Sequence, residues 1–150
     1  VGTFSGYSAL SMAEGLEDGG HLYTFEINDE QEDFTRPWIE QSPWADRITF
    51  LIGDAITEAP RLGVSFDLAF IDGDKRTYRE TYEMALSVVR KGGFILADNT
   101  LWDGHVVDPS YGKDQQTHGI VSFNDYVRQD SRVERVILPL RDGLTLIRKL

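Results

Sequence analysis

Oxygen-bearing side chains follow two apolar segments of the chain, and together they could hold a metal ion. Asp72 follows the apolar run 66–71, and Asp98 and Asn99 follow the run 93–97. Both runs predict buried strands, and open α/β sheets bind their ligands at the carboxyl ends of strands. Carboxylate and amide oxygens suit Mg²⁺ or Ca²⁺. Ordinary solvated acids are the alternative, although uncompensated acids close together repel one another.

A lysine lies within reach of this acidic pair in the sequence. Lys75 stands three residues after Asp72, at the expected start of a helix. An amine held over a metal site is a candidate general base, which takes a proton from a substrate. The alternative is a solvated lysine that pairs with Asp72 or Asp74.

A glycine-containing turn near the start of the chain predicts a second kind of site. Gly2 and Gly6 have the spacing G-x-x-x-G, which is not the G-x-G-x-x-G of dinucleotide sites. Glu26 lies 20 residues after Gly6, at the end of the next expected strand, where an acid can accept hydrogen bonds from both ribose hydroxyls of a nucleoside. An ordinary turn, and an acid that caps the chain before Asn28, are the alternatives. Together these residues suggest a nucleoside cofactor.

A third short segment, Gly53, Asp54 and Ala55, follows the expected strand 48–52. Its backbone amides and small side chain suit an adenine ring. A plain helix start explains it equally well.

Apolar runs and helical patterns alternate along the chain, which is typical of βαβ units. This rhythm predicts an α/β fold with a doubly wound, mostly parallel sheet. Expected helices are 6–16, 29–41, 56–62, 78–89 and 120–129. Expected strands are 21–25, 48–52, 66–71, 93–97, 133–138 and 144–147. Residues 101–118 predict a long loop, and the turn at Asp142 and Gly143 predicts a C-terminal hairpin with one antiparallel strand.

Length and composition limit the possible functions. The 150 residues predict a single domain over 1–150. A net charge of −10 argues against binding nucleic acid or anionic membranes. The chain has no cysteine, and its three histidines lack metal-ligand spacing. With no membrane-length apolar run and no export signal at its start, we expect a cytoplasmic protein.

Four segments together resemble one family. They are residues 4–8 (FSGYS), 70–75 (FIDGDK), 98–104 (DNTLWDG) and the closing stretch 138–143. They resemble the cation-dependent, S-adenosylmethionine-dependent O-methyltransferases of the caffeoyl-coenzyme A and catechol type, over essentially the whole chain. The resemblance implies a Rossmann-like class I methyltransferase fold. Relative to that family, helices before the first strand and the start of that strand are expected to be missing.

The resemblance also implies roles for individual residues. S-adenosylmethionine is expected to contact Gly2, Thr3, Gly6, Ser8, Glu26, Asp54, Ala55, Asp72 and Asp74. The expected ligands of a divalent cation, Mg²⁺ first with Mn²⁺ or Ca²⁺ as alternatives, are Asp72, Asp98 and Asn99. Lys75, with Asp72, is the expected catalytic pair, and Trp102 and Tyr78 lie near a small phenolic acceptor. A homodimer is expected by the same resemblance.

Three other functions fit parts of the pattern. A nicotinamide-dependent dehydrogenase shares the alternating fold and the ribose acid, but it lacks a use for Lys75 and the oxygen ligands. A non-catalytic S-adenosylmethionine-binding protein would need only Glu26 and the glycine turn. A nucleic-acid methyltransferase is disfavoured by the negative charge.

Overall fold

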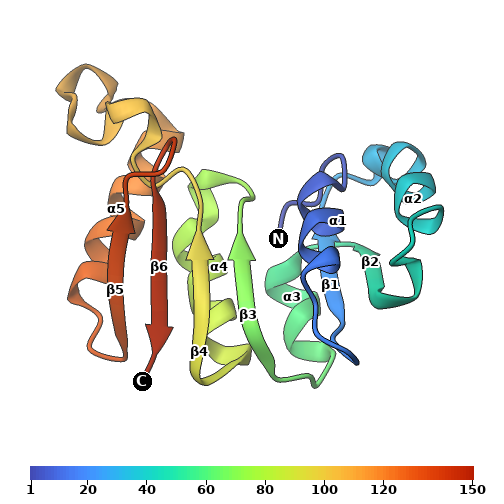
Figure 1. Ribbon diagram of the computed structural model, residues 1–150. Helices are drawn as coiled ribbons and strands as arrows, with labels where there is room; N and C mark the ends of the chain where they lie inside the picture. The colour runs from blue at the N-terminus through green and yellow to red at the C-terminus, as the bar shows by residue number, and fades with distance from the viewer. The chain divides into compact units, whose positions relative to one another are not determined.

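The computed structural model describes residues 1–150 and consists of two compact units, Val1–Glu58 and Ala59–Leu150. Figure 1 labels their helices and strands. None of the helices combines the length and apolar character that a membrane crossing needs.

Unit 1 is built on two parallel strands. Its regular elements are α1 (Tyr7–Glu14), β1 (Leu22–Glu26), α2 (Glu32–Glu40) and β2 (Ile48–Ile52), with 3₁₀ turns at Asp29–Gln31 and Ala45–Arg47. Strands β1 and β2 pair in parallel, with Glu26 opposite Ile52 at their carboxyl ends. The apolar faces of the helices and strands meet in a small core of Ala13, Ile39, Ile48 and Phe50. The glycine turn and Glu26 therefore belong to one folded unit.

Helix α3 (Ala55–Arg61) follows β2, and the remaining elements form unit 2. They are β3 (Phe66–Ile71), α4 (Tyr78–Val88), β4 (Val89–Ala97), α5 (Gln115–Gln129), β5 (Val133–Leu138) and β6 (Leu144–Lys149), with 3₁₀ turns at Lys75–Thr77, Trp102–Val107 and Pro109–Tyr111. The strand order is β3-β4-β6-β5. β3 and β4 are parallel, whereas β6 is antiparallel to both β4 and β5.

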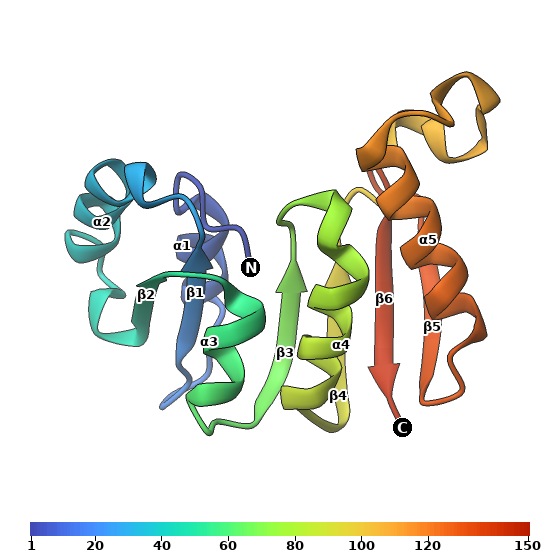
Figure 2. The same ribbon diagram turned by 180° about the vertical axis from the view of Figure 1, so that it is seen from behind.

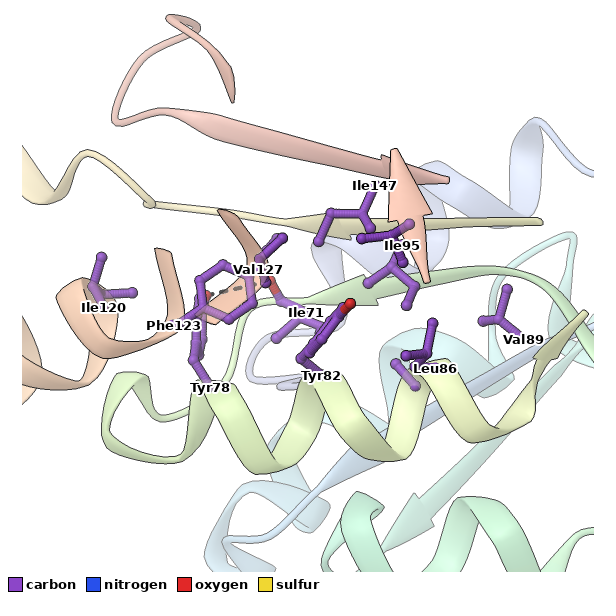
Figure 3. Close-up of a cluster of buried hydrophobic side chains, with 13 residues drawn as sticks. Ile71, Tyr78, Tyr82, Leu86, Val89, Ile95, Ile120, Phe123, Val127 and Ile147 are labelled. Carbon is purple, nitrogen blue, oxygen red and sulfur yellow. Dashed lines mark hydrogen bonds between the residues drawn. The ribbon is translucent and has the colours of Figure 1, made fainter. Parts of the chain in front are cut away.

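Helices α4 and α5 lie on the same face of this four-stranded sheet (Figures 1 and 2). Side chains of the sheet that face the helices, such as Ile71, Ile95 and Ile147, are completely buried. Tyr78 and Tyr82 of α4 meet them together with Phe123 of α5 (Figure 3). This core fixes the carboxyl ends of β3 and β4, because the last residues of both strands, Ile71 and Ala97, are 0% exposed.

The predicted α/β class, with parallel strands and a C-terminal antiparallel strand, is confirmed. β2 and β3 have the predicted bounds. Two bounds are corrected. Helix α5 begins at Gln115, not at residue 120, because the Asp114 carboxylate caps it by accepting the Thr117 N–H at 2.7 Å. β4 begins at Val89, not at residue 93, because Val89 already pairs with Phe66.

Candidate active site

The glycine turn of unit 1 is held against the end of β1. The backbone N–H groups of Gly2 and Thr3 both donate to the Phe25 carbonyl, at 3.1 and 3.2 Å. The Thr3 hydroxyl lies 2.7 Å from that of Thr24. Gly6 has φ +80°, a left-handed conformation that favours glycine, and Ser8 follows in the first turn of α1. The turn is thus a fixed loop between the strand and the helix.

Glu26 lies beside this turn, as its sequence position predicts. Its side chain is buried, and its two carboxylate oxygens accept hydrogen bonds from different backbone amides: Phe4 N at 2.8 Å and Asn28 N at 3.0 Å. The bond to Asn28 is the local contact that the alternative interpretation described. Each carboxylate oxygen keeps acceptor capacity for a further donor, and the contact with ribose hydroxyls stays a prediction.

Asp54 and Ala55 form the start of helix α3. The Asp54 carboxylate accepts the Ile56 N–H at 2.9 Å, and Ala55 is buried. The Gly53 N–H donates to the Glu26 carbonyl at 2.8 Å, which ties this segment to the end of β1. Helix capping accounts for the local geometry, and the adenine contact stays a prediction.

In unit 2 the predicted oxygen ligands stand at two neighbouring strand ends. Ile71 and Ala97 are directly opposite each other, so Asp72 and Asp98 follow paired residues. The Asp98 N–H donates to the Ile71 carbonyl at 3.0 Å. Asn99 has φ +58°, a conformation that asparagine adopts more readily than most residues, and its N–H donates to the Asp98 carboxylate at 2.8 Å. The three residues are half-buried at one edge of the sheet.

The Asp72 and Asp98 carboxylates both affect the pKa of the same neighbour, Tyr78. Burial raises the pKa of the Tyr78 hydroxyl, and the negative charges of Asp72 and Asp98 both raise it further.

The structure contains no cluster of three or more His, Cys, Asp or Glu side chains that could hold a metal ion. The predicted ligand set consists of two carboxylates and one amide, and hard oxygen donors of this kind fit Mg²⁺ or Ca²⁺.

Lys75 is buried, with 6% of its surface exposed, rather than solvated. Its Nζ donates to the Asp72 carboxylate at 2.9 Å and to the Tyr78 hydroxyl at 2.7 Å. The same Nζ lies 4.7 Å from the centre of the Tyr78 ring and 5.9 Å from that of Trp102. The ion pair with Asp72 that the alternative interpretation described is present, but it lies in a largely enclosed, aromatic environment.

Asp74 is exposed and bound to its neighbour. Its carboxylate accepts the Arg76 backbone N–H at 3.0 Å and three hydrogen bonds from the Arg76 guanidinium. These bonds from Arg76 lower the pKa of Asp74. The cofactor contact expected of Asp74 stays a prediction.

The two expected acceptor contacts differ in exposure. Trp102 is half-buried, at the start of a 3₁₀ turn. Tyr78 is 0% exposed, and its hydroxyl faces Lys75. Of the two, only Trp102 has exposed surface, and its contact with an acceptor stays a prediction.

Several residues that support this site were not singled out from the sequence. The Gln116 side chain accepts the Lys75 N–H at 3.2 Å. Gly143 was predicted only as part of the hairpin turn, and its carbonyl oxygen also accepts the N–H of Thr100, the residue after Asn99, at 3.0 Å. Gly119 lies against the backbone of Lys75. Asp114 was the one detectable signal, because aspartate is a preferred N-cap residue at the start of a helix.

Comparison with known proteins connects this arrangement to a family. The sequence profile described as O-methyltransferase matches residues 1–150. Caffeoyl-CoA O-methyltransferase 1 of Eucalyptus globulus is 34% identical, and tricin synthase 2 of Oryza sativa subsp. japonica is 38% identical, over the whole of this chain. The chain spans 65% and 55% of the lengths of these two relatives.

Solved structures agree with the sequence relatives. The O-methyltransferase from Bacillus cereus in complex with SAH superposes with a TM-score of 0.90 at 29% identity, covering 99% of this chain and 71% of that one. TomG from Streptomyces achromogenes, in complex with SAM, gives a TM-score of 0.89 at 27% identity, covering 99% and 70%. The chain belongs to the O-methyltransferase family.

Proposed function

We propose that this protein transfers a methyl group from S-adenosylmethionine to a hydroxyl of a small catechol-like or phenolic acceptor, with the help of a divalent cation. The observation that carries the proposal is Lys75, buried between the Asp72 carboxylate and the Tyr78 hydroxyl at the end of β3. An enclosed amine at a strand end, beside two carboxylates and an amide, suits proton removal better than structural support.

S-adenosylmethionine is supported as the cofactor by the two solved relatives that hold SAH and SAM. Glu26 would accept the ribose hydroxyls, since its oxygens are already fixed by Phe4 N and Asn28 N. The backbone of the Gly2–Ser8 turn, tied to Phe25, would supply further contacts. The cofactor contributes an electrophilic methyl carbon bound to a sulfonium.

A phenolic acceptor is supported by the names of the relatives, which include caffeoyl-CoA O-methyltransferases. Asp72, Asp98 and Asn99 would hold the cation, and Mg²⁺ fits their oxygen donors, with Mn²⁺ and Ca²⁺ as alternatives. The chemistry that such an ion supplies is Lewis-acid polarisation of a hydroxyl oxygen.

Three residues of unit 2 would have separate roles in the methyl-transfer step. Lys75 would take the acceptor's hydroxyl proton on Nζ, so that the oxygen becomes a better nucleophile. Asp72 would orient that amine through its 2.9 Å hydrogen bond. Trp102 would lie along the acceptor ring and exclude water from Lys75.

The test is methyl transfer from radiolabelled S-adenosylmethionine to catechol, with Mg²⁺ or with excess EDTA. Labelled product with Mg²⁺ and none with EDTA supports the proposal. Equal product formation in EDTA would show that methyl transfer does not need a divalent cation. Calorimetric binding of S-adenosylmethionine without turnover on any catechol or phenol would favour a non-catalytic binding protein instead.

A further inference from the structure

The Tyr78 hydroxyl is placed between the amine of Lys75 and the two strand ends that carry the acidic residues. Its oxygen lies 2.7 Å from Lys75 Nζ, 2.9 Å from the Asp98 carbonyl oxygen and 3.3 Å from the Ile71 carbonyl oxygen. We propose that Tyr78 is a positioning residue, which fixes the direction of the Lys75 amine and does not contact the acceptor. This inference rests on the proposed function.

The hydrogen-bond roles follow from the number of protons. A phenol has a single hydroxyl proton, and a backbone carbonyl can only accept, so this proton is directed to Asp98 or Ile71. The Tyr78 oxygen must therefore accept from Lys75 Nζ. Asp72 is a second acceptor for the same amine, at 2.9 Å.

These two acceptors fix the orientation of the Lys75 amine. Nζ has three tetrahedral directions besides its bond to the side-chain carbon, and the hydrogen bonds to Asp72 and Tyr78 occupy two of them. The third direction is the one left for proton exchange with the acceptor. Without the Tyr78 oxygen, the amine could rotate about its last carbon–nitrogen bond, and this direction would no longer be fixed.

The ring that carries the hydroxyl cannot move aside. Tyr78 is 0% exposed and meets Phe123 edge-on, with ring centres 5.5 Å apart and an interplanar angle of 82°. Figure 3 shows it in the core between α4, α5 and the sheet. A rigid ring on a helix holds the hydroxyl more firmly than a loop side chain would.

The chain offers a matched control one helical turn later. Tyr82 is also 0% exposed, also meets Phe123 edge-on, and donates its hydroxyl to the Asp130 carboxylate at 2.9 Å. Tyr82→Phe and Tyr78→Phe each remove a buried hydroxyl from the same core. Only Tyr78→Phe removes a partner of Lys75.

The experiment compares the two variants in steady-state methyl transfer to catechol with Mg²⁺. We expect Tyr78→Phe to lower kcat by about 10- to 100-fold, as for a misoriented catalytic group, with KM for both substrates within about twofold of wild type. Tyr82→Phe should keep kcat within about twofold. Thermal melting of both variants establishes that they are folded at the assay temperature.

A double-mutant cycle with Lys75→Met tests whether Tyr78 acts through the lysine. We expect Tyr78→Phe to have no further effect on the residual rate of Lys75→Met. The inference is overturned by a wild-type kcat in Tyr78→Phe, by equal losses in Tyr78→Phe and Tyr82→Phe, or by additive losses in the cycle. In all three results Lys75→Met still loses turnover and the proposed function stands. If the wild-type protein itself does not transfer a methyl group, both the inference about Tyr78 and the proposed function are overturned.

Discussion

Gly119 of helix α5 lies directly against the backbone of Lys75. A Cβ atom at this position would lie 2.3 Å from the Lys75 carbonyl oxygen and 2.9 Å from the Arg76 Cα. Both neighbours are backbone atoms, which cannot move aside as a flexible side chain can. The glycine therefore lets α5 approach the segment that carries the proposed base, and Gln116 on the same helix accepts the Lys75 N–H.

This contact makes Gly119→Ala a sensitive test of the support behind Lys75. Overpacking of this kind costs about 1 to 3 kcal/mol, which outweighs the roughly 1 kcal/mol that alanine gains over glycine in a helix. We expect a lower free energy of unfolding in urea and a lower kcat. Gly15→Ala is the control, because its nearest neighbour would lie at 3.6 Å. Wild-type stability and kcat in Gly119→Ala would show that the contact is not needed.

The acid of unit 1 is tested by Glu26→Gln. The amide that replaces one carboxylate oxygen is a donor, and it would face the N–H of Phe4 or Asn28, which are donors too. Loss of a charged acceptor costs roughly 1.5 to 3 kcal/mol, so we expect the calorimetric Kd for S-adenosylmethionine to rise by about 10-fold or more. Glu30→Gln, an exposed acid on the following turn, should leave the Kd unchanged. Equal Kd values for Glu26→Gln and Glu30→Gln would show that Glu26 does not bind the cofactor.

The proposed cation ligands are tested by Asp98→Asn. Removing one of two carboxylates weakens binding of a hard cation, because fewer negative charges face it. We expect turnover at 1 mM Mg²⁺ to fall on the order of 100-fold and to recover partly at higher Mg²⁺. The control is Asp103→Asn, an exposed acid in the same segment. If higher Mg²⁺ does not restore turnover in Asp98→Asn, and the Mg²⁺ concentration dependence is that of wild type, Asp98 is not a cation ligand.

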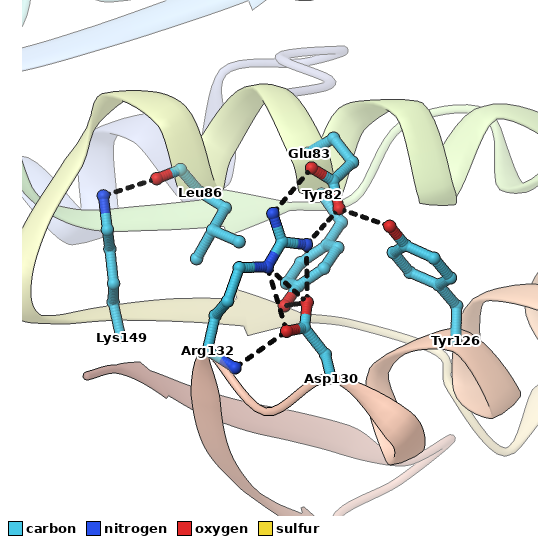
Figure 4. A network of polar contacts seen from close by, with 7 residues as sticks. All are labelled: Tyr82, Glu83, Leu86, Tyr126, Asp130, Arg132 and Lys149. Atoms are coloured by element: carbon cyan, nitrogen blue, oxygen red, sulfur yellow. Dashed lines mark hydrogen bonds and ion pairs between the residues drawn. The ribbon is translucent and has the colours of Figure 1, made fainter.

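A polar network outside the site predicts how stability depends on pH. Arg132 binds both Glu83 and Asp130, while Tyr82 donates to Asp130 and Tyr126 donates to Glu83 (Figure 4). Hydrogen bonds from the Arg132 side chain are the largest cause that lowers the pKa of Asp130, to about 2 from an ordinary value of 3.8. The folded protein therefore favours the charged carboxylate, and this stabilisation is present above about pH 4 and lost as pH falls through 2.

Asp130→Asn should accordingly lower the free energy of unfolding at pH 7 by about 1 to 2 kcal/mol, a modest value because Arg132 is half-exposed. Urea titrations from pH 7 to 2 should show the difference from wild type shrinking below pH 4. Asp125→Asn, whose exposed carboxylate pairs with Arg128, should cost less than about 1 kcal/mol. A difference that persists unchanged to pH 2 would contradict the charge-based explanation.

The parts of the fold that the sequence predicted are those with strong local signals. The apolar run of β3, the periodic apolar face of α4 and the Asp-Gly turn before β6 depend on neighbours within a few residues. The start of α5 was missed because residues 101–118 are rich in Asp, Gly and Pro, and because Gly119 lowers the local helix signal. Its capping by Asp114 outweighs that composition.

The site was predictable only in part, for the same reason. Strand ends place Asp72 beside Asp98, and the spacing from Gly6 places Glu26 beside the glycine turn. The contacts of Gln116 and Gly119 with Lys75 join residues more than 40 positions apart, and no local pattern encodes them. Burial of Tyr78 likewise depends on Phe123 of α5, so the contact of its hydroxyl with Lys75 could not be read from the sequence.

The most direct test of the central claim is the rate of methyl transfer to catechol by Lys75→Met, with saturating S-adenosylmethionine and Mg²⁺. Loss of a general base lowers rates by about 10²- to 10⁴-fold, and we expect kcat to fall within this range while S-adenosylmethionine still binds. Lys113→Met, at an exposed lysine, is the control and should keep wild-type kcat. Wild-type turnover in Lys75→Met would contradict the assignment of Lys75 as the base.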